Sequence, residues 1–298
     1  MPKRKLTQPP PHGRYAQLTL DFAFKKAFGT EQDKDLLIAL LNAFLERKLP
    51  SPIIDVHIAN PYVPGKTRGK RGAIFDIHCQ DTMGNKFMVE MQMAKQKFFI
   101  QRTLFNLSMA ITNSIKKGED SNFSFPCIYS LNFLNFDLDF GEGCNNIMQY
   151  ISLSNEDKPK IRYKYVNLVY VRLTRFGKSI EECRSLQDKL LFTLRHAHEL
   201  KTKPKQLKGT LFDRLYEIME FSNFTDMEYS EYMSQMIAKI DRRAQLACAR
   251  EEGFGEGKTE GRAEGREEIL DLIRQGKSLA DIENLIAKPH FVRDNGIF

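Results

Sequence analysis

Apolar residues recur with a helical period near the start of the sequence. The period begins at Leu20 in LDFAFKKAF and continues in EQDKDLLIALLNAFLERKL, where six apolar side chains fall on one stripe of a helix. These six are Leu36, Leu37, Leu40, Leu41, Phe44 and Leu45. The Pro50-Ser51-Pro52 segment breaks the pattern. The sequence therefore predicts two helices, the second of which ends before this break.

Shorter runs with β character follow the predicted helices. They occupy residues 53–58, 73–80, 86–93, 126–134 and 163–174, and a long amphipathic stretch at 95–116 predicts a further helix. A group of strands flanked by helices in this order favours an α/β core.

The C-terminal part has a helical pattern from residue 180 to about 250, after which composition changes abruptly. Residues 252–267 read EGFGEGKTEGRAEGRE, so that Glu-Gly recurs every four residues. A lone helix of this sequence would be weak, because each glycine costs about 1 kcal/mol and like charges lie four residues apart. Two interpretations remain: a helix that forms against a second copy of the chain, in a homo-oligomer, and a flexible charged linker. Ser278 is expected to cap a last short helix, LADIENLIAK.

Composition limits the class of protein. The chain has 298 residues, of which 42% are hydrophobic, and 45 Lys and Arg against 38 Asp and Glu, so its net charge is +7. This is enough apolar material for a core, and the basic excess is compatible with a polyanionic partner such as DNA. Without a run of about 18 apolar residues or an apolar signal region in MPKRKLTQPPPH, we expect a cytoplasmic protein that does not bind membranes. Five cysteines without a CxxC pair indicate neither a disulfide framework nor a structural zinc site.

The segment AIFDIHCQDTMGNKFMVEMQM, residues 73–93, shows the period of two that is typical of half-buried strands. In the first arm Phe75, Ile77 and Cys79 form the apolar set, and Asp76 belongs to the polar set. The linking DTMGN is rich in turn formers. The segment is therefore predicted to be a β-hairpin.

A turn centred on Met83 would place Asp76 directly opposite Glu90, with Gln92 on the same face of the sheet. The Cβ atoms of such a pair lie about 4.5–5.5 Å apart. Two carboxylates at this separation repel each other unless a cation lies between them, and oxygen ligands suit a hard divalent ion, Mg²⁺ or Mn²⁺. The pattern thus favours a metal site, while a solvated outer face of the hairpin is the alternative.

Three segments in this order resemble a known family. The arrangement D-x₁₃-E-x-Q across a hairpin, followed at once by a helix, is similar to the PD-(D/E)XK nuclease core. Together with LDFAFKKAF near the start and the C-terminal Glu-Gly repeat, it resembles the PD-(D/E)XK nuclease family transposases, the Rpn-type recombination-promoting nucleases. The resemblance covers roughly residues 15–268. It implies a restriction-endonuclease-like α/β core sheet flanked by helices, with a helical C-terminal extension.

The resemblance also implies roles for single residues. Asp76 and Glu90 correspond to the two acids of the motif and would bind the metal ion. Gln92 stands where the general motif has a lysine, and Phe75 where it has a proline. A glutamine can orient a water molecule but carries no charge to activate it, so these departures bear on the catalytic rate and leave the fold intact.

Asp21 and Lys25 match the family signature D-x-x-F-K on the first helix. The resemblance implies that Asp21 points at the metal site. Lys25, on the same helical face, is expected to contact DNA. The alternative is that Asp21 caps its helix.

Further cations are candidates for contacts with DNA phosphates. Arg102 would lie on the helix after Gln92, where it could reach a phosphate or pair with Glu90. The loop NPYVPGKTRGKRG holds four more cations just before the Asp76 strand, and a solvated basic loop is the alternative there. These four are Lys66, Arg68, Lys70 and Arg71.

The sequence divides into four segments by composition. We expect a flexible basic tail at 1–13, a nuclease-like core at 14–178, a helical extension at 179–250, and the Glu-Gly repeat with its short helix at 251–298. The leading hypothesis is a Mg²⁺-dependent DNA endonuclease with little sequence specificity, linked to recombination or mobile elements. The alternative is a nuclease-fold DNA-binding or assembly module with weak or no catalysis.

Overall fold

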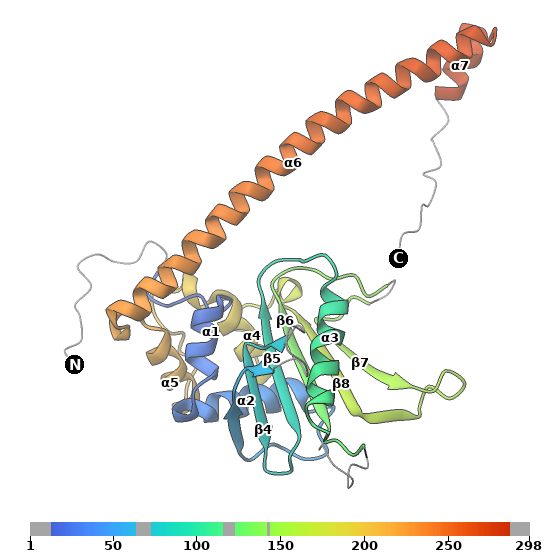
Figure 1. The fold of residues 1–298 in the computed structure, drawn as a ribbon. Coiled ribbons are helices and arrows are strands. Elements are labelled where there is room, and N and C mark those ends of the chain that lie inside the picture. Colours follow the sequence, from blue (N-terminus) through green and yellow to red (C-terminus); the bar gives the residue numbers. More distant parts are fainter. Residues whose placement is uncertain (1–12, 64–72, 116–122, 142–143, 287–298) are drawn as a thin grey trace. The chain divides into compact units, whose positions relative to one another are not determined.

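The protein is described by a computed structural model that covers residues 13–63, 73–115, 123–141 and 144–286 (Figure 1). Its centre is a six-stranded mixed sheet in the order β1-β4-β5-β6-β8-β7. The strands are β1 (Val56–Ala59), β4 (Ile77–Asp81), β5 (Lys86–Gln92), β6 (Ile128–Leu134), β7 (Met148–Ser154) and β8 (Arg162–Arg172). Strands β5, β6 and β8 are parallel, and the outer pairs are antiparallel. A second, two-stranded sheet pairs β2 (Tyr62–Val63) with β3 (Ala73–Ile74).

Helices cover both faces of the sheet, which confirms the expected α/β class (Figure 1). On one face α1 (Asp21–Phe28), α2 (Lys34–Leu45), α4 (Leu186–His196) and α5 (Thr210–Met219) share one apolar core with the sheet. On the other face α3 (Phe99–Thr112) packs in a second core. Short 3₁₀ turns occupy Glu31–Asp33, Leu173–Arg175, Ala197–Glu199 and Phe221–Asn223.

The hydrophobic pattern explains these layers. All six apolar residues of the predicted stripe on α2 are buried. Strand β6, IYSLNFL, is buried at every position, as expected for a central strand with helices on both faces.

One expectation about the strands was wrong, and one strand was missed. The predicted strand at 73–80 is interrupted, because Phe75 packs with Met88 and Phe99 in the second core whereas Ile77 and Cys79 belong to the first. Phe75 therefore does not share a face with Ile77. Strand β7, which closes one edge of the sheet, was not predicted from the sequence at all.

The chain divides into two compact units, residues 1–236 and 237–298. Helix α6 (Asp226–Arg274) runs without a break through the Glu-Gly repeat, so the interpretation of this segment as a flexible linker was wrong. Its assembly with a second copy stays a prediction. Ser278 precedes α7 (Leu279–Ile286) and caps it as predicted, because its hydroxyl accepts a hydrogen bond from the Asp281 N–H. Among the described helices none combines the length and apolar character that crossing a membrane requires.

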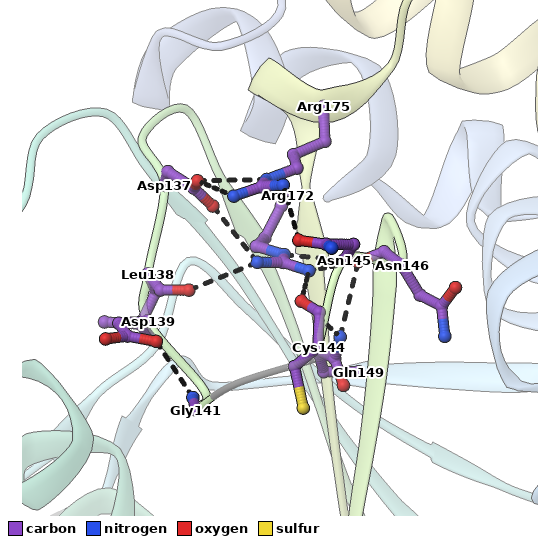
Figure 2. A network of polar contacts seen from close by, with 10 residues as sticks. All are labelled: Asp137, Leu138, Asp139, Gly141, Cys144, Asn145, Asn146, Gln149, Arg172 and Arg175. Atoms are coloured by element: carbon purple, nitrogen blue, oxygen red, sulfur yellow. Dashed lines mark hydrogen bonds and ion pairs between the residues drawn. The ribbon is translucent and has the colours of Figure 1, made fainter.

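A buried arginine fastens the chain at the carboxyl end of the central strands (Figure 2). Arg172, the last residue of β8, is 2% exposed and donates hydrogen bonds to the backbone carbonyls of Leu138, Cys144 and Asn146. It also pairs with Asp137 at 3.2 Å. Two segments of the connection between β6 and β7 are thereby held beside the end of β8.

Candidate active site

The β4–β5 hairpin has the register that the sequence predicted. Ile77 pairs with Val89 and His78 with Met88, so Asp76, one residue before β4, lies opposite Glu90. The turn forms because the Asp81 carboxylate accepts the N–H groups of residues 83 and 85, each at 2.9 Å. Gly84 supplies the positive φ of 84° that the turn requires.

Asp76 is held where the strand begins. Its Oδ2 accepts the N–H of Met91 at 2.6 Å, so a side chain occupies the place of a backbone partner. Its other oxygen, Oδ1, lies 3.7 Å from the Lys25 ammonium group. The Asp76 side chain is 17% exposed.

Helix α1 contributes Asp21 and Lys25 to this point. The N-cap residue of α1 is Leu20, and Asp21 is the first helical residue, so the interpretation of Asp21 as a cap was wrong. The Lys25 Nζ lies 2.7 Å from Asp21 Oδ1. The structure thus brings Asp21, Lys25 and Asp76 together, as the resemblance implied.

Burial, and to a smaller extent the neighbouring acids, perturbs the pKa values of Asp76 and Glu90. Burial raises the pKa of Asp76 to about 7; the hydrogen bond from Met91 opposes this shift, and the charge and hydrogen bond of Asp21 add to it. Burial and the charge of Asp76 raise the pKa of Glu90 well above its ordinary value. Glu90 Oε1 is buried and accepts no hydrogen bond from any described residue. A cation at this position would relieve both groups.

Gln92 is fixed by the helix that follows it. Arg102 on α3 donates to Gln92 Oε1 and to Gln96 Oε1, and Gln92 Nε2 donates to the Ala94 carbonyl at 3.3 Å. Arg102 therefore bonds to Gln92 and not to Glu90, although its charge lowers the pKa of Glu90. The arrangement places a guanidinium group close to the position where the general motif has a lysine.

These residues line a cleft of about 740 Å³ between the hairpin and α3. Asp76, Glu90 and Gln92 form one wall, and α3 with the turn before it forms the other. The second wall includes Lys97, Phe98, Gln101, Arg102, Phe105 and Asn106. Sequence reasoning found only Arg102 among these six. The spacing of Gln101, Arg102 and Phe105 along α3 was the available signal, because these three positions lie on one face of the helix.

The loop cations Lys66, Arg68, Lys70 and Arg71 lie outside the described residues, so their role in phosphate binding stays a prediction.

The donor set suits a hard divalent cation. In the described part of the chain no three acidic, histidine or cysteine side chains surround one point closely enough to hold a metal ion by themselves. Mg²⁺, however, is commonly bound by one or two carboxylates together with water and substrate phosphates. The opposed carboxylates of Asp76 and Glu90, the latter with an unpartnered oxygen, meet that description.

An α/β sheet whose central hairpin opposes two acids, beside a helix that carries a third, is the arrangement of the PD-(D/E)XK nuclease class. The chain belongs to the PD-(D/E)XK nuclease family transposases: the model of that family matches residues 18–249. The family predicted from the sequence is confirmed, and the chain is a member of a nuclease family linked to mobile elements. No curated protein and no solved structure matched the chain.

Proposed function

We propose that this protein is a divalent-metal-dependent DNA endonuclease that hydrolyses phosphodiester bonds with little sequence specificity during recombination or the movement of mobile elements. The observation that carries the proposal is the pair Asp76 and Glu90, which oppose each other beside a cleft with both pKa values raised. Membership of a nuclease family supports it.

Asp76 and Glu90 would hold Mg²⁺ or Mn²⁺, with Asp21 next to them. When bound, the ion would polarise the scissile phosphate and lower the pKa of the attacking water. The bond from Met91 fixes one oxygen of Asp76 and leaves the other facing the site. Lys25 balances part of the negative charge. Burial lowers the pKa of its ammonium group, but the hydrogen bond with Asp21 and the charges of Asp21, Asp76 and Glu90 together raise it above its ordinary value.

Gln92 and Arg102 act as a unit in this proposal. The guanidinium group donates to Gln92 Oε1, and one N–H of the Gln92 amide donates to the Ala94 carbonyl, so the second N–H is left to orient a water molecule. Arg102 supplies the positive charge that glutamine lacks and is placed to contact a phosphate. Binding through phosphates carries little sequence information and weakens steeply with salt.

A non-catalytic DNA-binding module is the second candidate. It is favoured by Lys25, whose ammonium group lies 2.7 Å from Asp21 and 3.7 Å from Asp76 and thus competes with a metal ion for the same carboxylates.

Cleavage of supercoiled plasmid separates the two candidates. We expect nicking with Mg²⁺ or Mn²⁺, none with EDTA, and a loss of at least about a hundredfold in Asp76→Asn, because a neutral amide binds the ion poorly. Asparagine keeps an oxygen that can accept the Met91 N–H, so the fold is retained. Asp157→Asn, an exposed acid in the β7–β8 connection, is the matched control and should cleave at the wild-type rate.

Wild-type cleavage by Asp76→Asn would disprove the assignment of the site. A protein that binds DNA but cleaves it with neither Mg²⁺ nor Mn²⁺ would favour the second candidate.

A further inference from the structure

Exposed aromatic rings lie beside the acids. Phe98 and Phe105 line the cleft together with Asp76 and Glu90, and the two residues are 63% and 37% exposed. They stand on the wall formed by α3, which packs against β3 and β6 (Figure 1). The opposite face of α3 is buried through Phe99 and Leu107 and the residues around them. Packing of the helix therefore accounts for the buried face and not for the rings in the cleft.

Phe98 has an unusual backbone conformation. Its φ is 61°, in the left-handed region that bulky side chains rarely adopt. This conformation directs Phe98 into the cleft while Phe99, the next residue, enters the core. Strained residues of this kind cluster at functional sites.

The polar residues around the rings suit a nucleotide. The Lys97 ammonium group lies 5.1 Å from the centre of the Phe98 ring, and Arg102 lies one helical turn further along α3. Both cations can contact phosphates. The amides of Gln101 and Asn106 offer donors and acceptors to base edges.

We propose that this cleft binds a single-stranded segment of DNA, with unpaired bases stacked on Phe98 and Phe105 and their phosphates directed at the acid pair. The inference rests on the proposed function, whose substrate class it specifies. Only an unpaired base offers its face to an aromatic ring, since the bases of a duplex already stack on each other. A cleft of about 740 Å³ has the size that small ligands occupy, which suits one or two nucleotides.

Binding can be measured without cleavage. Full-length Asp76→Asn protein with Mg²⁺ is titrated into three fluorescein-labelled DNAs of equal length: a single strand, its duplex, and a single strand with abasic sites at its centre. The abasic strand has the same phosphates but lacks bases to stack. The change in fluorescence anisotropy during each titration gives the Kd. We expect the ordinary single strand to bind most tightly.

Variants assign the effect to the rings. Phe98→Ala and Phe105→Ala in this background should each weaken single-strand binding about tenfold and leave binding of the abasic strand unchanged. Phe98→Tyr, which keeps a ring, should bind as the parent does. Phe98→Gly removes the ring and relieves the positive φ. It should show the same loss of about tenfold in single-strand binding, so it tests the ring even if the alanine protein folds poorly. Phe123→Ala is the control, because Phe123 is 76% exposed with a φ of 56° but does not line the cleft.

Three results would overturn the inference: equal affinity for all three DNAs, equal effects of Phe98→Ala and Phe123→Ala, or a lower mass of the free Phe98→Ala protein in light scattering with unchanged DNA affinity. The last would make this face a contact between copies of the chain. Metal-dependent plasmid cleavage that continues alongside any of these results would leave the proposed function standing. Failure of the wild type both to cleave and to bind DNA would remove the proposed function itself.

Discussion

At the scale of single residues, the pairing of Gln92 with Arg102 changes what a substitution toward the general nuclease motif would do. Sequence alone makes Gln92 the position where a lysine would restore a catalytic charge. In the structure Gln92 is the acceptor of a hydrogen bond from a guanidinium group, which can only donate. A lysine there would lose the acceptor and face a like charge. Glutamine at 92 and arginine at 102 are therefore best understood together.

We predict that Gln92→Lys lowers plasmid cleavage about tenfold or more, and that the double variant Gln92→Lys/Arg102→Gln recovers most of the loss. Gln92→Leu should lose activity with or without Arg102→Gln, because leucine neither accepts from the guanidinium nor orients water. Initial nicking rates of the variants, measured with Mg²⁺, form a double-mutant cycle. The two residues would act independently if the effects of the single substitutions on the rate multiplied in the double variant. A Gln92→Lys protein faster than the wild type would likewise contradict the prediction.

At the scale of elements, periodicity was informative where one face is clearly buried. It predicted α1, α2 and the β4–β5 hairpin, and turn chemistry fixed the register that opposes Asp76 to Glu90. It failed at β7, an edge strand whose residues are mostly half-buried or exposed, so that neither face gives a clear apolar pattern.

The candidate site likewise combines features that depend on local sequence with features that depend on packing between distant elements. The acid pair depends on local register, which a sequence can express. Lys97 and Phe98 enter the cleft only because α3 packs against the sheet, and the approach of Asp21 to Asp76 depends on α1 lying close to the residue that precedes β4. Such placements are tertiary. The family resemblance implied the one for Asp21, whereas the sequence carries no direct sign that Lys97 and Phe98 face the acids.

The Glu-Gly repeat in α6 gives a prediction at this scale. A Cβ atom added at Gly257 or Gly261 meets no atom within 4 Å, so no contact among the described residues explains these glycines. If their stripe packs against a second copy, Gly257→Ala/Gly261→Ala should increase helicity in circular dichroism and lower the oligomer mass in light scattering, because alanine favours the helix but separates the two backbones. Gly255→Ala, on another face of α6, should raise helicity alone. Equal masses for all these proteins would leave the stripe without a partner.

At the scale of the whole molecule, the charges of the site are linked to stability. The folded protein keeps Asp76 protonated up to about pH 7, whereas in the unfolded chain such a group ionises near pH 4. Between these values the folded state binds more protons, so the free energy of unfolding that this group contributes decreases as the pH rises. Glu90, whose pKa is also raised, acts in the same direction.

We therefore predict that the metal-free protein loses thermal stability between pH 5 and about pH 8, and that Asp76→Asn loses less over the same interval. Mg²⁺ should raise the wild-type Tm by several degrees at pH 8 and by much less at pH 5, where protons occupy the carboxylates. Differential scanning calorimetry in EDTA and in Mg²⁺ measures both effects. A Mg²⁺ shift of the same size in Asp76→Asn would place the binding ion elsewhere.

Arg172 has a consequence for how this protein can vary. Three of its partners, Leu138, Cys144 and Asn146, offer backbone carbonyls, which every amino acid possesses. The side chains of these three residues take no part in the contact, so the segment can change in sequence while the hydrogen bonds remain. Residue 172 itself cannot vary in this way, because even lysine lacks the planar guanidinium group with its five donors. We therefore expect related chains to vary at positions 138, 144 and 146 and to keep arginine at position 172.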